Sequence, residues 1–309
     1  MSVEVPPGAS FCSYSSRGRN DIEIGISPIA FTIGPVSVHW YGIMVALAVA
    51  TLVVWCWYFT RNRGITAEFV MGAALVLIPT GIIVSRLVHI LDKLGYYWDN
   101  PRAILSLEGM TIYGAILGGL LAGWVYCRLK RVTFAPLADL AAPGIIMAQA
   151  IGRVGCILNG CCTGKETSLP WAFVYTNPLT QATMYDPATG QVVSALYVPL
   201  HPTHLYELLG DLLIFVLLFW VFRGRLKPDG SLLALYLALY SALTFTVRFW
   251  RGDTTPVVGF VPEGQLISVI LFVGSVAWMV AKKTHWVRKQ DGPAAGEAET
   301  KASVGGNAG

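Results

Sequence analysis

The sequence predicts an all-α polytopic membrane protein with about seven transmembrane helices, and three observations favour this class. Charged residues make up 13% of the 309 residues, whereas a soluble domain has about 25%. Hydrophobic residues make up 54%, and the mean hydropathy is +0.57. A soluble chain of this length could not bury so much apolar surface. The apolar residues also form continuous runs near the ~20 residues that a helix needs to cross a bilayer.

Seven apolar runs are long enough to be spans, and they are continuous rather than alternating, which favours helices over the strands of a barrel. They cover residues 39–60, 67–92, 109–127, 135–158, 203–222, 231–250 and 262–281. The seven-helix domain is therefore expected at 39–283. Outside the spans we expect an extracytoplasmic N-terminal tail at 1–38, an extracytoplasmic loop at 159–202 and a disordered cytoplasmic tail at 284–309.

Lysine and arginine residues are distributed unevenly between the two sides. Thirteen flank the ends of the first, third, fifth and seventh spans, and six lie on the opposite side. Cytoplasmic loops retain Lys and Arg, so the N-terminus is expected outside and the C-terminus in the cytoplasm. The net charge of +4 is small and dispersed, which argues against a nucleic-acid partner.

Three arginines fall within or at the outer ends of spans: Arg86, Arg153 and Arg248. A charge at membrane depth costs several kcal/mol unless it is paired or hydrated, and such a residue is a candidate for function. The alternative is that each side chain reaches the headgroups from a helix end. Three arginines at a common depth favour an anionic ligand, because guanidinium groups bind phosphate and carboxylate through paired donors. A phospholipid headgroup fits best.

Acidic residues in the spans could pair with these arginines. The candidates are Asp139, Glu207 and Asp211, and Glu207 begins the fifth span at the same outer level. Polarity at a helix end, or pairing between helices, would explain them equally well.

Three cysteines cluster near the end of the fourth span: Cys156, Cys161 and Cys162. A four-ligand zinc site is excluded, because paired CxxC spacing and nearby histidines are missing. We therefore expect no metal and no cofactor. Reactive thiols and a disulfide remain alternatives, and packing of small residues is favoured over both.

Six segments, in order along the chain, resemble successive motifs of the prolipoprotein diacylglyceryl transferase family. They are HWYGIMVALA at 39–48, SRLVHIL at 85–91, GMTIYGAILGG at 109–119, GRVGCILNGCCTG at 152–164, HPTHLYE at 201–207 and LYSALTFTVRFWRGD at 239–253. The resemblance implies a multi-pass enzyme of the bacterial inner membrane. Such an enzyme transfers the diacylglyceryl group of phosphatidylglycerol to the lipobox cysteine of a prolipoprotein and releases glycerol phosphate, the first step of lipoprotein maturation.

The resemblance also implies site residues. Catalytic roles are expected for Arg153, Tyr113 and Arg248, and substrate binding for Tyr41, Arg86, Asn159, Gly164, His201, Glu207 and Tyr240. Some positions depart from the family pattern. Cys156, Ile157 and Cys161 stand where the family has Asn, Phe and Glu, and Tyr113, His204 and Thr244 stand where it has His, Gln and Arg.

Two chemical tasks follow from the implied reaction. The departing phosphate must be stabilised, which suits Arg153 with help from Arg248, one helical turn beyond Thr244. The acceptor thiol, with a pKa near 8.5, must lose its proton. Tyr113 is a poor base, because the pKa of a phenol is about 10. His39 and His201 are reserve bases, so the base stays unassigned.

Three other interpretations stay open. The chain could be a divergent lipid-binding paralogue without activity, or a lipid or anion transporter, although transporters commonly show an internal repeat and this sequence shows none. A seven-span receptor or retinal protein shares the topology. However, the last span has no lysine in its middle, and the intramembrane arginines would then be unexplained.

Overall fold

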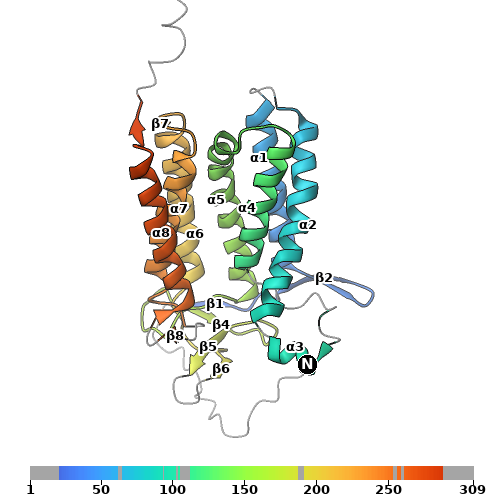
Figure 1. The fold of residues 1–309 in the computed structure, drawn as a ribbon. Helices are drawn as coiled ribbons and strands as arrows, with labels where there is room; N and C mark the ends of the chain where they lie inside the picture. Colours follow the sequence, from blue (N-terminus) through green and yellow to red (C-terminus); the bar gives the residue numbers. More distant parts are fainter. Residues whose placement is uncertain are drawn as a thin grey trace, which may run out of the picture. The chain divides into compact units, whose positions relative to one another are not determined.

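The computed structural model describes residues 21–61, 65–92, 94–101, 104, 112–186, 191–252, 256–258 and 261–287. Helices form at each of the seven predicted spans (Figure 1). They are α1 (Trp40–Thr60), α2 (Ala67–Asp92), α4 (Ile112–Leu129), α5 (Phe134–Asn159), α6 (Thr203–Val216), α7 (Ser231–Val247) and α8 (Glu263–Ala281). The predicted fold class, an all-α polytopic membrane protein, is confirmed.

Five of these helices are long and apolar enough to cross a membrane, and α4 and α7 supply shorter apolar helices. α6 reaches spanning length because it continues as a π-helix over Leu217–Phe222. Large apolar side chains on the helices are exposed, for example Leu75 at 73% and Val280 at 71%. Such surfaces are stable in lipid but not in water.

Residues 109–111, at the predicted start of the third span, lie outside the described residues. The sixth span ends at Val247 instead of residue 250. Arg248 therefore follows α7 rather than lying inside it. A short helix, α3 (Leu94–Asp99), occupies part of the interval between α2 and α4.

The chain divides into two compact units. Unit 1 comprises residues 1–48, 146–216 and 237–277, and unit 2 comprises residues 49–145, 217–236 and 278–309. Helices α1, α5, α7 and α8 each contribute to both units, so the division falls within these helices and not between them. Unit 1 holds eight of the ten predicted site residues, all except Arg86 and Tyr113.

Unit 1 contains short strands that the sequence analysis did not predict. Within the N-terminal tail, β1 (Ile22–Ile24) pairs in parallel with β4 (Phe173–Tyr175), and β2 (Ile29–Ile33) forms a hairpin with β3 (Val36–His39). Within the 159–202 loop, β5 (Thr183–Asp186) pairs with β6 (Gln191–Ser194).

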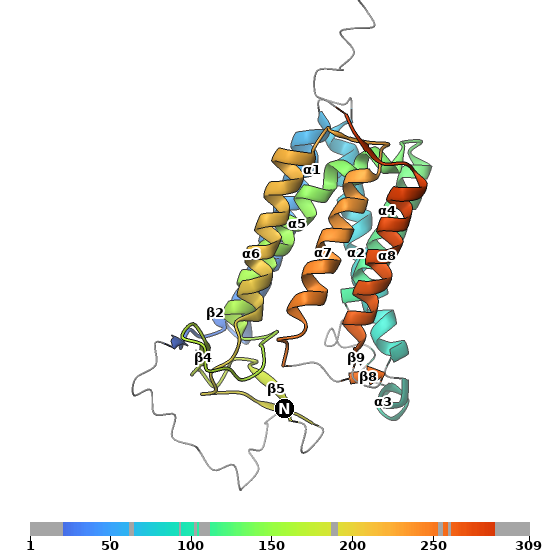
Figure 2. The same ribbon diagram turned by 90° about the vertical axis from the view of Figure 1, so that its left-hand side faces the viewer.

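The β1–β4 pair has its own small core, in which Tyr175 and Ala182 are buried with Ile24 and Phe173. β4 and β5 lie beside the first turn of α6 (Figure 2). A further hairpin joins β8 (Pro256–Val258) and β9 (Val261–Pro262) ahead of α8. The 159–202 segment is thus a folded part of unit 1.

Unit 2 contains α2 and α4, which pack side by side (Figure 1). Asp139 of α5 accepts hydrogen bonds from the backbone N–H groups of Gly230 and Leu233, at 2.7 and 2.8 Å, and so caps the start of α7. The alternative of helix-end polarity therefore holds for Asp139.

The chain end beyond α8 also belongs to unit 2. β10 (His285–Trp286) pairs with β7 (Leu226–Lys227), so the first residues of the segment predicted as a disordered tail form a strand. The rest of that tail, 288–309, and the first part of the N-terminal tail, 1–20, lie outside the described residues.

Candidate functional site

An ion pair between α5 and α6 is at the centre of unit 1. The Arg153 Nη1 atom lies 2.8 Å from the Glu207 Oε2 atom, and the two side chains are 18% and 2% exposed. Arg153 is in the last two turns of α5, and Glu207 is in the second turn of α6. Of the alternatives left open for Glu207, the structure shows pairing with an intramembrane arginine, between two helices.

A second carboxylate lies one helical turn beyond Glu207 on the same face of α6. Asp211 is 0% exposed, and among the described residues neither of its carboxylate oxygens has a hydrogen-bond partner. It interacts electrostatically with both Arg153 and Glu207. The side of Arg153 toward α6 is therefore strongly acidic, which favours a fixed guanidinium.

Two tyrosines predicted to bind substrate also lie in unit 1. Tyr240 of α7 is close enough to interact electrostatically with Arg153. Tyr41, the second residue of α1, packs against the backbone of α5 at Gly155, where a Cβ atom would lie 3.2 Å from its ring. Three helices thus bring a predicted residue to the region of Arg153.

Hydrogen bonds hold the turn that follows α5. Asn159 donates from Nδ2 to the Gln181 side chain at 3.1 Å, and its carbonyl accepts from the Gln181 backbone at 2.9 Å. The Thr163 hydroxyl donates to the Thr183 carbonyl at 2.7 Å, and the Thr203 hydroxyl donates to the Cys162 carbonyl at 2.6 Å. Asn159 therefore fixes the turn to the loop that contains Gln181.

Gly164 ends this turn at a point of close backbone approach. Its N–H donates to the His201 carbonyl at 3.0 Å, and it bridges to Arg251. A Cβ atom at this position would lie 2.6 Å from the His201 oxygen and 2.9 Å from the Trp250 oxygen, so only glycine fits.

His201 itself lies just outside the fifth span, with its Nδ1 atom 3.3 Å from the Tyr206 hydroxyl. Burial and the neighbouring Lys165 lower the pKa of His201. Its imidazole is therefore held toward the neutral form, which a base requires.

His204 stands where the family has Gln, and it pairs with Tyr175. The Tyr175 hydroxyl lies 3.0 Å from His204 Nε2 and donates to the Ile157 carbonyl at 3.0 Å. Burial raises the pKa of Tyr175, so its hydroxyl keeps the proton that it donates. The pair joins β4 to the ends of α5 and α6.

Arg248 lies at the end of α7 and packs against α8. Its N–H donates to the Thr244 carbonyl at 3.0 Å, so the two residues are one helical turn apart, as predicted. A Cβ atom on Gly264 would collide with the Arg248 guanidinium. Gly264 therefore leaves the space that this guanidinium occupies.

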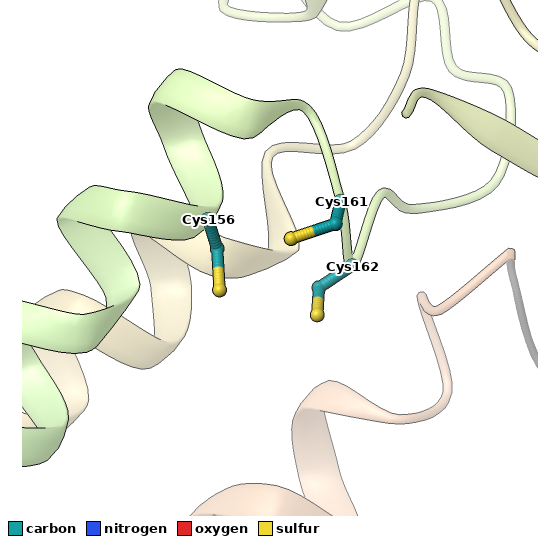
Figure 3. A group of neighbouring side chains, drawn as sticks. All are labelled: Cys156, Cys161 and Cys162. Atoms are coloured by element: carbon teal, nitrogen blue, oxygen red, sulfur yellow. The ribbon is translucent and has the colours of Figure 1, made fainter. Parts of the chain in front are cut away.

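The three clustered cysteines converge (Figure 3). Cys156 projects from the end of α5 and Cys161 and Cys162 from the turn, with their sulfur atoms toward one another. All three sulfur atoms lie within 4.8 Å of each other, and each cysteine is a free thiol. The disulfide that was one of the possibilities for these cysteines is therefore not formed in the structure.

A family model described as "Prolipoprotein diacylglyceryl transferase" matches residues 28–281. The chain belongs to the prolipoprotein diacylglyceryl transferase family. The resemblance inferred from the six motifs is thus confirmed, and with it the prediction of a membrane-bound transferase.

Relatives of this family are similar along most of their length. A protein from Dehalococcoides mccartyi strain 195 is 40% identical over 262 residues, covering 84% of this chain and 95% of the relative. A protein from Corynebacterium efficiens is 34% identical over 252 residues, covering 79% and 77%. One from Clostridium tetani is 30% identical over 249 residues, covering 80% and 94%. Each is named phosphatidylglycerol–prolipoprotein diacylglyceryl transferase.

Two predicted residues of the transferase family site belong to unit 2. Arg86 donates from Nη2 to the Ile104 carbonyl at 3.5 Å, and its guanidinium carbon lies 5.2 Å from the centre of the Tyr97 ring. Tyr113 is in the first turn of α4, and its side chain lies outside the described part of the chain. The predicted roles of both residues stay predictions.

Several residues of the site were missed by sequence reasoning. Gln181 and Tyr175 lie in the loop, far in sequence from Asn159 and His204, and no local pattern marks either pair. Gly264 is the second residue of α8, and nothing in the sequence distinguishes it from other small residues. Glu207 and Asp211 were found by sequence reasoning, because they are acids within an apolar span.

Proposed function

We propose that this protein transfers the diacylglyceryl group of phosphatidylglycerol to the lipobox cysteine thiol of a prolipoprotein. A thioether forms and glycerol phosphate is released. The observation that carries the proposal is the enclosed Arg153–Glu207 pair, in a chain of the prolipoprotein diacylglyceryl transferase family.

The proposed reaction is a substitution at the glyceryl carbon that bears the phosphate. The sulfur forms a bond to this carbon while the carbon–oxygen bond breaks, and negative charge collects on the departing phosphate. Donors aimed at developing charge lower the barrier most when they are fixed in advance. Glu207 fixes the Arg153 guanidinium from one side, which leaves its other donors for a phosphate oxygen.

The remaining residues are proposed to surround the same substrate. Tyr41, Tyr240 and Arg248 come from α1, α7 and the end of α7 within unit 1, and Arg248 is proposed to assist Arg153. Asn159, Gly164 and His201 shape the turn and the loop beside it. Arg86 is proposed to bind the phospholipid, and Tyr113 to position the acceptor or donate a hydrogen bond to it.

We place the protein in the bacterial inner membrane, with the N-terminus outside and the C-terminus in the cytoplasm. The bias of Lys and Arg between alternate helix ends supports this orientation. A green fluorescent protein fused after Gly309 should fluoresce in a bacterial host. A dark fusion, with alkaline phosphatase active at the same position, would reverse the orientation.

The proposal is tested by transfer of labelled diacylglycerol from phosphatidylglycerol to a lipobox peptide, using the full chain purified in detergent. Wild type should form thioether-linked product. Arg153→Ala should lose at least about 100-fold in rate, as does removal of an oxyanion donor in other enzymes. Arg128→Ala is the matched control, because Arg128 is in the last turn of α4 and stacks on Trp124. It should keep the wild-type rate.

Loss of folding is separated from loss of chemistry by thermal unfolding of each variant and by Arg153→Lys, which keeps the charge without the paired donors. No product from folded wild type, with phosphatidylglycerol still bound, would contradict the proposal and indicate a lipid-binding paralogue. Phospholipid movement across vesicles without product would indicate a transporter.

A further inference from the structure

The cluster of Cys156, Cys161 and Cys162 has no assigned role in the proposed transfer. Their three sulfur atoms lie within 4.8 Å of one another. Each residue is a free thiol. Three soft donors that converge on one point are the ligand set of thiophilic cations such as zinc.

The spacing of the sulfur atoms fits one ion. Zinc binds thiolate sulfur at about 2.3 Å, which places the sulfur atoms of a tetrahedral site about 3.8 Å apart. The separations between the sulfur atoms, all 4.8 Å or less, exceed this value by no more than about 1 Å, a movement within reach of side-chain torsions.

The backbone that carries the thiols is held in place. The Thr203 hydroxyl fixes the Cys162 carbonyl at 2.6 Å, and the Asn159 carbonyl is fixed by Gln181 at 2.9 Å. Cys162 has a φ of 64°, a left-handed conformation that is uncommon for a residue other than glycine. This turn brings adjacent cysteines to the same side as Cys156, as Figure 3 shows. A site held in this way needs little rearrangement to bind a metal.

Nearby charge favours the metal-bound form. Three thiolates and one zinc ion together carry one negative charge. Arg251 interacts electrostatically with Cys162, so it lies close enough to balance that charge, whereas Arg153 is already paired with Glu207. This balance of charge is an argument separate from the distances between the sulfur atoms.

Burial differs among the three cysteines. Cys156 is buried, whereas Cys161 and Cys162 are half-buried. Among the described residues, no histidine or carboxylate joins the three thiols as a fourth ligand. Zinc sites with three protein ligands keep a fourth position for water or substrate, unlike closed structural sites.

We propose that Cys156, Cys161 and Cys162 bind one zinc ion through three thiolates and leave the fourth position to an external thiol. The second part rests on the proposed function, in which the acceptor is a thiol with no assigned base. A thiol that binds zinc gives its proton to solvent and is held as the thiolate. The site would therefore supply the deprotonation that Tyr113 is poorly suited to perform.

The metal site is tested on the full chain in detergent, reduced and dialysed against zinc, by metal content per chain. Wild type should hold one zinc ion, and cobalt in its place should give the absorption bands of sulfur-to-cobalt charge transfer. A variant with Cys156→Ser, Cys161→Ser and Cys162→Ser should lose both signals. Cys56→Ser with Cys127→Ser is the matched control, since these thiols lie outside the cluster, and it should retain both.

Equal metal in wild type and the triple variant, or none in folded wild type, would overturn the site. The open position is tested by adding a lipobox peptide, and the same peptide with serine for cysteine, to the cobalt form. Only the cysteine peptide should shift the cobalt bands, and no shift would overturn the acceptor role. Transfer by wild type after removal of metal would likewise overturn that role while leaving the proposed function standing.

Discussion

Buried carboxylates in the two units are stabilised in different ways. In unit 2, both oxygens of Asp139 accept backbone N–H bonds at the start of α7. In unit 1, Glu207 faces a guanidinium, and Asp211 has no hydrogen-bond partner among the described residues. All three residues are acids on apolar helices, and the sequence separated only Glu207, by its position at the same outer level as the arginines.

The comparison distinguishes two roles for an acid in an apolar helix. A carboxylate whose partners are backbone N–H groups completes a helix end. A carboxylate paired with an arginine side chain sets the orientation of that arginine, and a buried acid without hydrogen bonds raises the free energy of the site. The buried acids of unit 1 therefore lower its stability, as is typical of a functional site.

The largest effect is expected from Glu207→Gln. The amide cannot neutralise Arg153, so the guanidinium should lose its fixed orientation and transfer should fall about 100-fold. The measurement is kcat with labelled phosphatidylglycerol. Asp139→Asn makes the same chemical change in unit 2 and should leave kcat unchanged, because Asp139 bonds backbone N–H groups at the start of α7. The Asn amide accepts only one of these two bonds, so the variant should lose some stability but not its rate per folded molecule. Equal losses in both variants would remove the distinction between the two carboxylates.

A smaller effect, on folding, is expected from Gly164→Ala. The added Cβ atom would lie 2.6 Å from the His201 oxygen, and relief of that contact should lower the free energy of unfolding by about 2 kcal/mol. Thermal unfolding in detergent measures it. Gly152→Ala is the control, since nothing lies within 4 Å of its Cβ position, and it should be neutral or stabilising by up to about 1 kcal/mol. Similar losses of unfolding free energy in both variants would show that the close contact at Gly164 is not the cause of the destabilisation.

Tyr175→Phe should destabilise unit 1 by about 1–2 kcal/mol, because the Ile157 carbonyl loses its donor and His204 loses a partner. The measurement is the midpoint of thermal unfolding. Tyr197→Phe is a control, since the Tyr197 ring is 44% exposed, and its midpoint should not move. An unchanged midpoint for Tyr175→Phe would show that water replaces the lost donor.

The smallest effect is expected from Asp139→Ala. Loss of the cap on α7 should cost about 1 kcal/mol of unfolding free energy, with the transfer rate per folded molecule unchanged. Unfolding in detergent and the transfer assay on the same preparation check both parts. A drop in kcat would mean that Asp139 acts on the reaction as well as on the helix.

The sequence predicted the seven helices to within three residues at their ends, because apolar length is a local property and lipid demands it. It also predicted the family, because six motifs can be recognised in order along the chain without any knowledge of contacts. Arg153 and Glu207 were marked as candidates by their cost in an apolar run.

The tertiary structure decided which candidates work together. It paired Arg153 with Glu207 rather than with Asp139, and it brought Gln181 to Asn159 and Tyr175 to His204 across a loop. It also turned three cysteines, favoured in the sequence as packing, into a convergent group of thiols. Partners far apart along the chain are set by packing, and a sequence pattern with a helical or strand period cannot encode them. Composition and motifs thus determined the class and family of this protein, and only the fold determined the chemistry at its centre.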